Sequence, residues 1–172
     1  MSLNKNPSDI QYRYWQKLNK YVENHSRIKC NKIEKGPRIT LTFNSLLADM
    51  HLAFKNSPNE AIVRLHITNK EFYTFVFNQK ETIEKELNQV LNWNSPYENK
   101  DSYNIELKRD IEFYNESKWQ EYIEWHVSNA EKFIEIFFDK IDEFEEDIKQ
   151  IRTLTLSDTN QDSLSYDDAV NF

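Results

Sequence analysis

The chain has 172 residues, a net charge of −7 and a pI of about 5.2, and 14% of its residues are aromatic. This length suffices for one domain with an aromatic-rich core, and the acidic balance argues against binding to nucleic acids or anionic membranes except through a local basic patch. The single cysteine, Cys30, excludes an intrachain disulfide and a cysteine-ligated zinc site, and the single glycine, Gly36, excludes glycine-rich phosphate loops.

Composition also divides the chain into three parts. Residues 1–7 are predicted to be a flexible N-terminus, residues 8–152 a single α+β domain, and residues 153–172 an acidic disordered tail without Lys or Arg. We find no apolar run long enough to cross a bilayer and no signal-peptide pattern. We therefore expect a cytoplasmic protein that has no membrane partner.

The first expected element is a helix over residues 9–25, which begins at a capping box formed by Ser8 and Gln11. Three segments in which apolar residues recur at every second position follow, and we interpret them as strands with one buried face: residues 37–44, 47–54 and 60–68. Short polar turns join these segments, which favours an antiparallel meander.

The register of this meander follows from the requirement that the apolar side chains share one face of the sheet. Pairing Phe54 with Ala61 meets this requirement. The same register places two polar pairs opposite each other, Asp49 with His66 and His51 with Arg64.

A second helix is predicted over residues 72–87, after a capping box of Thr68 and Glu71. Asn88 suits its left-handed C-cap, because Asn tolerates positive φ better than any residue except Gly. Two further strands are expected at residues 90–94 and 102–108.

A long helix is predicted over residues 118–151, capped by Ser117 and Gln120, and at about 1.5 Å per residue it spans roughly 50 Å. His126 is expected to be half-buried on this helix. Apolar residues near its C-terminal end step by four and three, a heptad-like seam that predicts self-association: Phe137, Ile141, Phe144, Ile148 and Ile151. Packing of the same residues on the first helix is the alternative.

The element order is therefore α-β-β-β-α-β-β-α, which predicts an α+β fold with a single antiparallel sheet of about five strands and three helices. The three helices are expected to cover one face of the sheet, which leaves the other face open to solvent or to a partner.

Several stretches, taken together in order, resemble those of one protein family. They are Tyr12-Arg13-Tyr14-Trp15, Val63-Arg64-Leu65-His66-Ile67, Ile83-Glu84, Glu86-Leu87-Asn88, Leu91-Asn92-Trp93, then Trp119, Tyr122, Trp125 and Lys132-Phe133. The chain resembles an uncharacterised bacterial family, one of the domains of unknown function, found alone or C-terminal to restriction-endonuclease-like domains. The resemblance implies a role near DNA restriction or defence, and it carries no catalytic residues over.

The open sheet face supplies the candidate binding residues, which share one side of the predicted strands: Thr40, Asp49, His51, Arg64 and His66. Of these, His51 and His66 are weak candidates for metal ligands with help from Asp49. The alternative is an ordinary solvated face whose charges pair across strands, as in most one-sided sheets.

A catalytic alternative depends on Glu106 and Lys108, because Glu-x-Lys on a strand resembles the core of PD-(D/E)XK nucleases. Two carboxylates would then hold Mg²⁺, with Asp49 or Asp101 as the second, and the lysine would help to position the attacking water.

We therefore expect a non-enzymatic binding or assembly module without a cofactor, accessory to a restriction or defence system. Its partner would be an unknown protein or a second copy of the chain, and nucleic acid would be reached only through a partner or a local patch. The alternative is a metal-dependent nuclease or other hydrolase.

Overall fold

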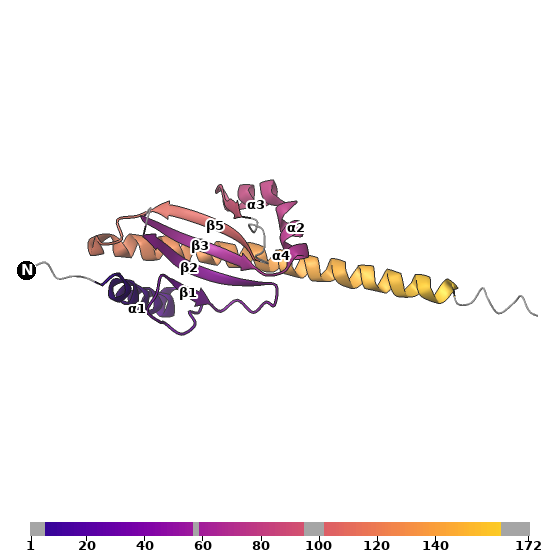
Figure 1. The fold of residues 1–172 in the computed structure, drawn as a ribbon, viewed down its shortest axis with the longest axis horizontal. Helices are drawn as coiled ribbons and strands as arrows, with labels where there is room; N and C mark the ends of the chain where they lie inside the picture. The colour runs from indigo at the N-terminus through magenta and orange to yellow at the C-terminus, as the bar shows by residue number, and fades with distance from the viewer. Residues whose placement is uncertain (1–5, 57–58, 95–101, 163–172) are drawn as a thin grey trace, which may run out of the picture.

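The computed structural model describes residues 6–56, 59–94 and 102–162. Its centre is one five-stranded antiparallel sheet with the strand order β1-β2-β3-β5-β4. Figure 1 shows β1, β2, β3 and β5 side by side in this order. The strands are β1 (Arg38–Leu41), β2 (Ala48–Asn56), β3 (Asn59–Ile67), β4 (Asn92–Asn94) and β5 (Tyr103–Asp110). All five coincide with predicted strands, which confirms the α+β class.

The predicted register of β2 and β3 is confirmed. Phe54 pairs with Ala61, and the polar pairs Asp49–His66 and His51–Arg64 are also formed. Because side chains alternate between the two faces of a strand, this register sends most apolar residues of both strands to one face and the polar residues to the other, where Ala53 and Ile62 are the apolar exceptions.

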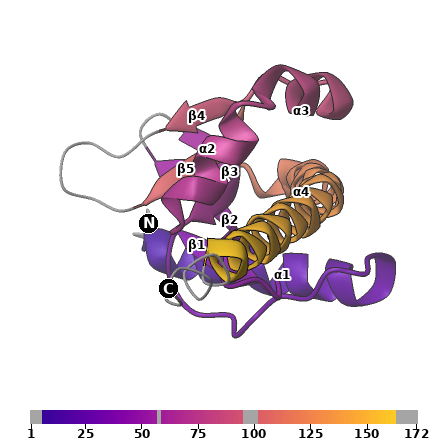
Figure 2. The same ribbon diagram turned by 90° about the vertical axis from the view of Figure 1, so that its right-hand side faces the viewer.

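The helices are α1 (Pro7–His25), α2 (Lys70–Phe77), α3 (Lys80–Leu87) and α4 (Trp119–Asp162), with a 3₁₀ turn, η1 (Glu116–Lys118), before the last. Figure 2 shows α1, α3 and α4 on one side of the sheet, and α2 lies at its end. The prediction of three helices was wrong, since the helix expected over residues 72–87 is two. Asn78 ends α2, and the break lets Val76 and Ile83 both reach the core from differently directed helices.

The predicted N-caps also lie elsewhere. Asn6 rather than Ser8 caps α1, with its side chain accepting from the Ser8 amide at 3.1 Å, and Pro7 takes the first helical position. Asn69 rather than Thr68 caps α2, accepting from the Phe72 amide at 2.7 Å. Asn is among the preferred N-cap residues, and in both helices it occupies the N-cap position in place of the predicted residue. The predicted C-cap at Asn88 is confirmed, with φ 52° and ψ 41°.

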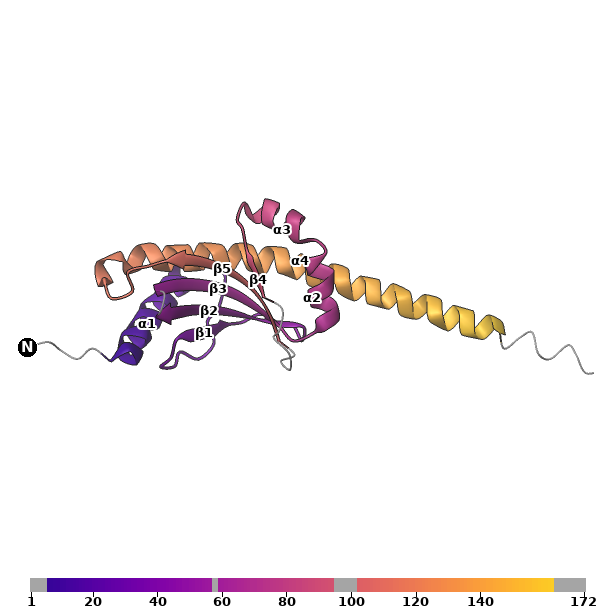
Figure 3. The ribbon, with the colours of Figure 1, turned by 45° about the horizontal axis from the view of Figure 1, so that its top comes forward.

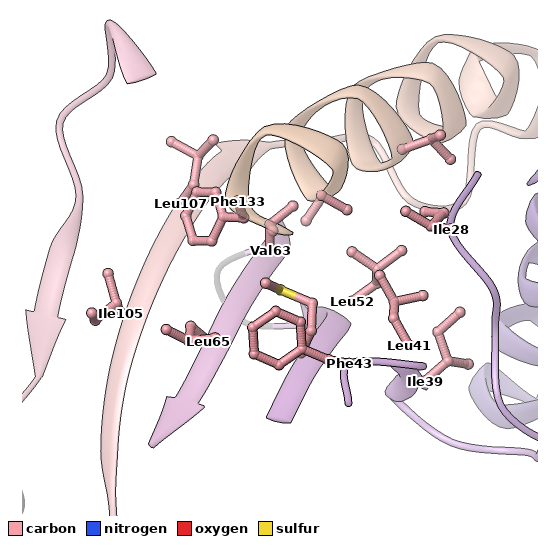
Figure 4. Close-up of a cluster of buried hydrophobic side chains, with 14 of the residues drawn as sticks. Ile28, Ile39, Leu41, Phe43, Leu52, Val63, Leu65, Ile105, Leu107 and Phe133 are labelled. Atoms are coloured by element: carbon pink, nitrogen blue, oxygen red, sulfur yellow. The ribbon is translucent and has the colours of Figure 1, made fainter. Parts of the chain in front are cut away.

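The helix-covered face of the sheet forms a single core. Figure 4 shows apolar side chains of the sheet, among them Leu52, Val63 and Leu65, below Phe133 of α4. The core also encloses a ring cluster around the fully buried His126, whose neighbours include Tyr14. The prediction of a half-buried His126 was wrong, because α1 closes over this part of α4.

The Tyr14 hydroxyl and His126 Nδ1 share a hydrogen bond of 2.8 Å. Burial lowers the pKa of His126 to about 3, and the backbone at Ala53 and Ile62 acts weakly in the opposite direction. Burial also raises the pKa of Tyr14 well above its ordinary value. The pair is therefore a neutral, buried polar contact inside an aromatic core.

Helix α4 is longer than the body of the domain and projects beyond it, as Figures 1 and 3 show. It was predicted to end at residue 151, with a disordered tail from residue 153, but it continues to Asp162. The segment 153–162 contains neither Gly nor Pro, so nothing in it stops a helix that is already formed. Residues 163–172 of the predicted tail and residues 1–5 of the predicted flexible N-terminus lie outside the described part of the chain.

Candidate functional site

The open face of the sheet carries a row of polar side chains that crosses all five strands. The register pairs Thr40 of β1 with His51 of β2, His51 with Arg64 of β3, Arg64 with Glu106 of β5, and Glu106 with Asn92 of β4. Neighbouring strands lie about 4.8 Å apart, so adjacent members of this row are within reach of one another. We call these five residues the polar row.

Glu106 is the anchor of the polar row. Its side chain is only 5% exposed, and both carboxylate oxygens are engaged. Arg64 Nε donates to Oε1 at 2.6 Å, Lys108 Nζ lies 3.1 Å from Oε2, and the Asn94 amide donates to Oε2 at 3.3 Å. Two cations and an amide thus compensate a nearly buried carboxylate, as burial of a charge requires.

The two histidines of the open face lie side by side. The rings of His51 and His66 are 5.8 Å apart and inclined by 24°, and His66 Nδ1 lies 3.0 Å from the Asn104 side-chain oxygen. His51 is only 6% exposed. Burial lowers its pKa to about 4, assisted by the positive charges of Arg38 and Arg64, so its ring is neutral at pH 7.

The predicted carboxylate pair of a nuclease does not come together in the described residues. Asp49 is on β2 and Glu106 is on β5, with Arg64 of β3 between them, which separates the two strands by about 10 Å. Two carboxylates that share one Mg²⁺ need oxygens within about 4 Å of each other, because each Mg–O bond is about 2.1 Å. Asp101 lies outside the described residues.

The predicted metal ligands were His51 and His66, with Asp49 nearby on the same face. Across residues 6–56, 59–94 and 102–162, no three His, Cys, Asp or Glu side chains are arranged so that they could hold a metal ion. Asp49 is exposed at the edge of this group, while Arg38 and Arg64 place positive charge beside His51.

The predicted association seam on α4 is largely used within the domain. Phe137 and Ile141 are buried in the core, and the Phe144 ring packs 5.4 Å from the rings of both Phe72 and Phe75 on α2. Toward the C-terminus, Ile148 is partly buried and Ile151 is 60% exposed. The part of the seam that remains accessible therefore begins after Phe144.

A groove that sequence reasoning missed lies where α1 ends beside α4. Its volume is about 1110 Å³, and its apolar floor is made by Ile28, Ile134 and Phe138. Its rim carries both basic side chains, Arg27 and Lys29, and acidic ones, such as Glu131. No single stretch of sequence contains these residues, so spacing could not have revealed the groove.

Cys30 carries the single thiol of the chain. It lies partly buried beside β1, where it forms an isolated bridge with Leu41. Burial, helped by the negative charge of Glu23, raises the pKa of the Cys30 thiol to about 11. The thiol therefore stays protonated at neutral pH, which makes it a poor nucleophile.

Among the described residues, no helix combines the length and the apolar character needed to cross a membrane. Searches of the curated proteins and of the solved structures found no match to the chain. A family profile does match, over residues 10–141, which is the whole sheet together with most of α1, all of α2 and α3, and the first half of α4. The chain therefore belongs to the family described as "Domain of unknown function (DUF4268)".

Proposed function

We propose that the chain is a non-enzymatic binding or assembly module that presents the open sheet face to its partner, as an accessory of a DNA restriction or defence system. The observation that supports the non-enzymatic role is that the Glu106 carboxylate is already occupied by neighbouring side chains. A nuclease of the alternative type needs this carboxylate free to bind a metal ion, yet both of its oxygens are held by Arg64, Lys108 and Asn94.

The polar row supports a binding role in a second way. Its members Arg64 and Glu106 hold each other in position, so this part of the face is preorganised before any partner arrives, which lowers the entropic cost of binding. The projecting end of α4 offers a second contact region, and we propose self-association through the seam beyond Phe144 as part of the assembly role.

The link to restriction or defence is supported by the family resemblance and not by the geometry. The genes that neighbour the gene for this chain provide a simple test of this link. We expect a gene for a methyltransferase, a helicase or a nuclease beside the gene for this chain, and a neighbourhood of unrelated metabolic genes would argue against the link.

A cleavage assay separates the binding module from the nuclease. The full chain is incubated with supercoiled plasmid in Mg²⁺ or Mn²⁺, beside Glu106→Gln and a control, Glu81→Gln, which changes an exposed carboxylate on α3. We expect no cleavage by any of the three and no metal-dependent shift in melting temperature. Metal-dependent cleavage that Glu106→Gln abolishes and Glu81→Gln retains would overturn the proposal.

A further inference from the structure

Two buried polar atoms of the open face lack a hydrogen-bond partner among the described residues, Nδ1 of His51 and Oε2 of Glu60, and the first of them lies in the polar row. Nδ1 of His51 has no hydrogen-bond partner among the described residues, although His51 is 94% buried. Leaving a buried polar group unpaired is unfavourable, so a native structure rarely keeps one without a reason such as a ligand or an ordered water.

Hydrogen-bond donors surround this ring. Thr40 and Arg64 flank His51 in the polar row, and Arg38 lies on the same face of β1, two residues before Thr40. Arg64 uses Nε for Glu106, which leaves the other N–H groups of its guanidinium for a ligand. Arg38 forms no ion pair with any described residue, and its side chain is exposed.

The charges around His51 favour an anion. The groups that act on it are Arg38, His66, Asp49 and Arg64, and of these only Asp49 is negative. The effect of Arg38 on the His51 pKa is larger than the opposing effect of Asp49, and Arg64 adds to it. The ring therefore sits in a locally positive potential, although the whole chain carries a net charge of −7.

We propose that Arg38, Thr40, His51 and Arg64 bind a phosphate-type oxyanion on the open sheet face. Guanidinium groups match the geometry of phosphate oxygens and form strong charge-assisted hydrogen bonds, and the imidazole and hydroxyl add donors at the centre. This inference rests on the proposed role of the face as a binding surface, and it names the chemistry of the ligand. The oxyanion comes either as a free phosphate or as part of a nucleic-acid backbone.

The test follows the His51 ring by NMR in the full chain. Sodium sulfate serves as the first probe, because it stays a dianion from pH 4 to 8, and sodium chloride at equal ionic strength is the reference. We expect a saturable sulfate-dependent shift of the His51 signals and an upward shift of the His51 pKa, because a bound anion stabilises the imidazolium.

Arg38→Ala should weaken sulfate binding about tenfold, which corresponds to about 1.4 kcal/mol. The matched control is Lys55→Ala, which removes an exposed cation from the same face of β2, about 13 Å along the strand from His51. We expect Lys55→Ala to bind as the parent chain does. Equal weakening by both substitutions, or a shift that never saturates, would overturn the proposal, because it would indicate general ionic attraction.

Inorganic phosphate and a ten-nucleotide oligo(dT) then distinguish the two sources of the oxyanion. Oligo(dT) that binds more tightly than phosphate, and loses this advantage in Arg38→Ala, identifies a nucleic-acid backbone as the ligand. Equal or weaker binding of oligo(dT) identifies a free phosphate compound. These readouts are independent of the cleavage assay, so failure of the oxyanion site and failure of the non-enzymatic role give different results.

Discussion

Acid should destabilise this protein through the buried His126, and the size of the effect can be worked out. The native ring binds a proton only near pH 3, whereas an unfolded histidine binds one near pH 6.5. Between these values the unfolded state carries more protons than the native state. Stability is therefore complete above about pH 6.5 and falls as the pH drops toward 3.

One pKa unit corresponds to about 1.36 kcal/mol, and integrating the proton uptake of the unfolded state from pH 7.5 to 5.0 gives a cost of about 2 kcal/mol through His126. That is a large fraction of a typical domain stability of about 5–15 kcal/mol. The neighbouring Tyr14 contributes no charge in this range, because burial raises its pKa well above 10.

The perturbation that isolates this effect is the double substitution Tyr14→Phe with His126→Phe. It replaces both partners of the 2.8 Å hydrogen bond together, so neither is left unsatisfied, and the surrounding cluster is already aromatic. Urea unfolding of both proteins at several pH values between 7.5 and 5.0 gives the two stability curves. His51 titrates in both proteins, and its contribution cancels in the difference.

We expect the difference in unfolding free energy between the parent and the double variant to shrink by about 2 kcal/mol from pH 7.5 to 5.0. Parallel curves over this range would show that His126 is not held neutral by burial. The reasoning about the core around α1 and α4 would then be wrong.

Four further predictions follow from single sites. Asn88→Gly should preserve or slightly raise stability and Asn88→Ala should lower it by about 1 kcal/mol in urea unfolding, because the left-handed cap favours Gly. Glu106→Ala should lower the unfolding free energy by about 1–3 kcal/mol in urea unfolding, because it leaves two partly exposed cations, Arg64 and Lys108, without their carboxylate. An unchanged urea midpoint would contradict the role of Glu106 as the anchor of the polar row. Cys30 should react slowly with iodoacetamide at pH 7.5 in the folded chain and rapidly in urea, and mass spectrometry follows both rates. Light scattering at high protein concentration should detect self-association that Ile148→Asp removes without loss of fold; a monomer at every concentration would refute the α4 seam.

The strands and their register were predictable because the evidence for them is local. The alternation in β2 and β3 leaves one register that gathers their apolar residues, except Ala53 and Ile62, on the helix-covered face, and a slip by one position would turn one strand's set toward the open face. Asn88 was predictable for a similar reason, since few residues adopt its backbone conformation at low cost.

The division of the second helix and the identity of the N-cap residues could not be predicted from the local sequence. Residues 70–87 have a continuous helical pattern, and only contacts with the sheet end and with α4 decide that α2 stops at Phe77. Competing caps such as Asn6 and Ser8 differ by a few tenths of a kcal/mol, which tertiary packing easily overrides.

Of the candidate site, the sequence by itself determined which residues share the open face, because the period of a strand is two. It did not reveal that Glu106 is nearly buried between Arg64 and Lys108, that Asp49 is kept from it by an intervening strand, or that His51 lies in a positive environment with an unsatisfied nitrogen. Those features depend on which strands become neighbours, and β5 joins β3 across more than thirty residues of intervening chain. Periodicity acts within a segment, whereas charge pairing and burial act between segments, so only the tertiary structure could decide them.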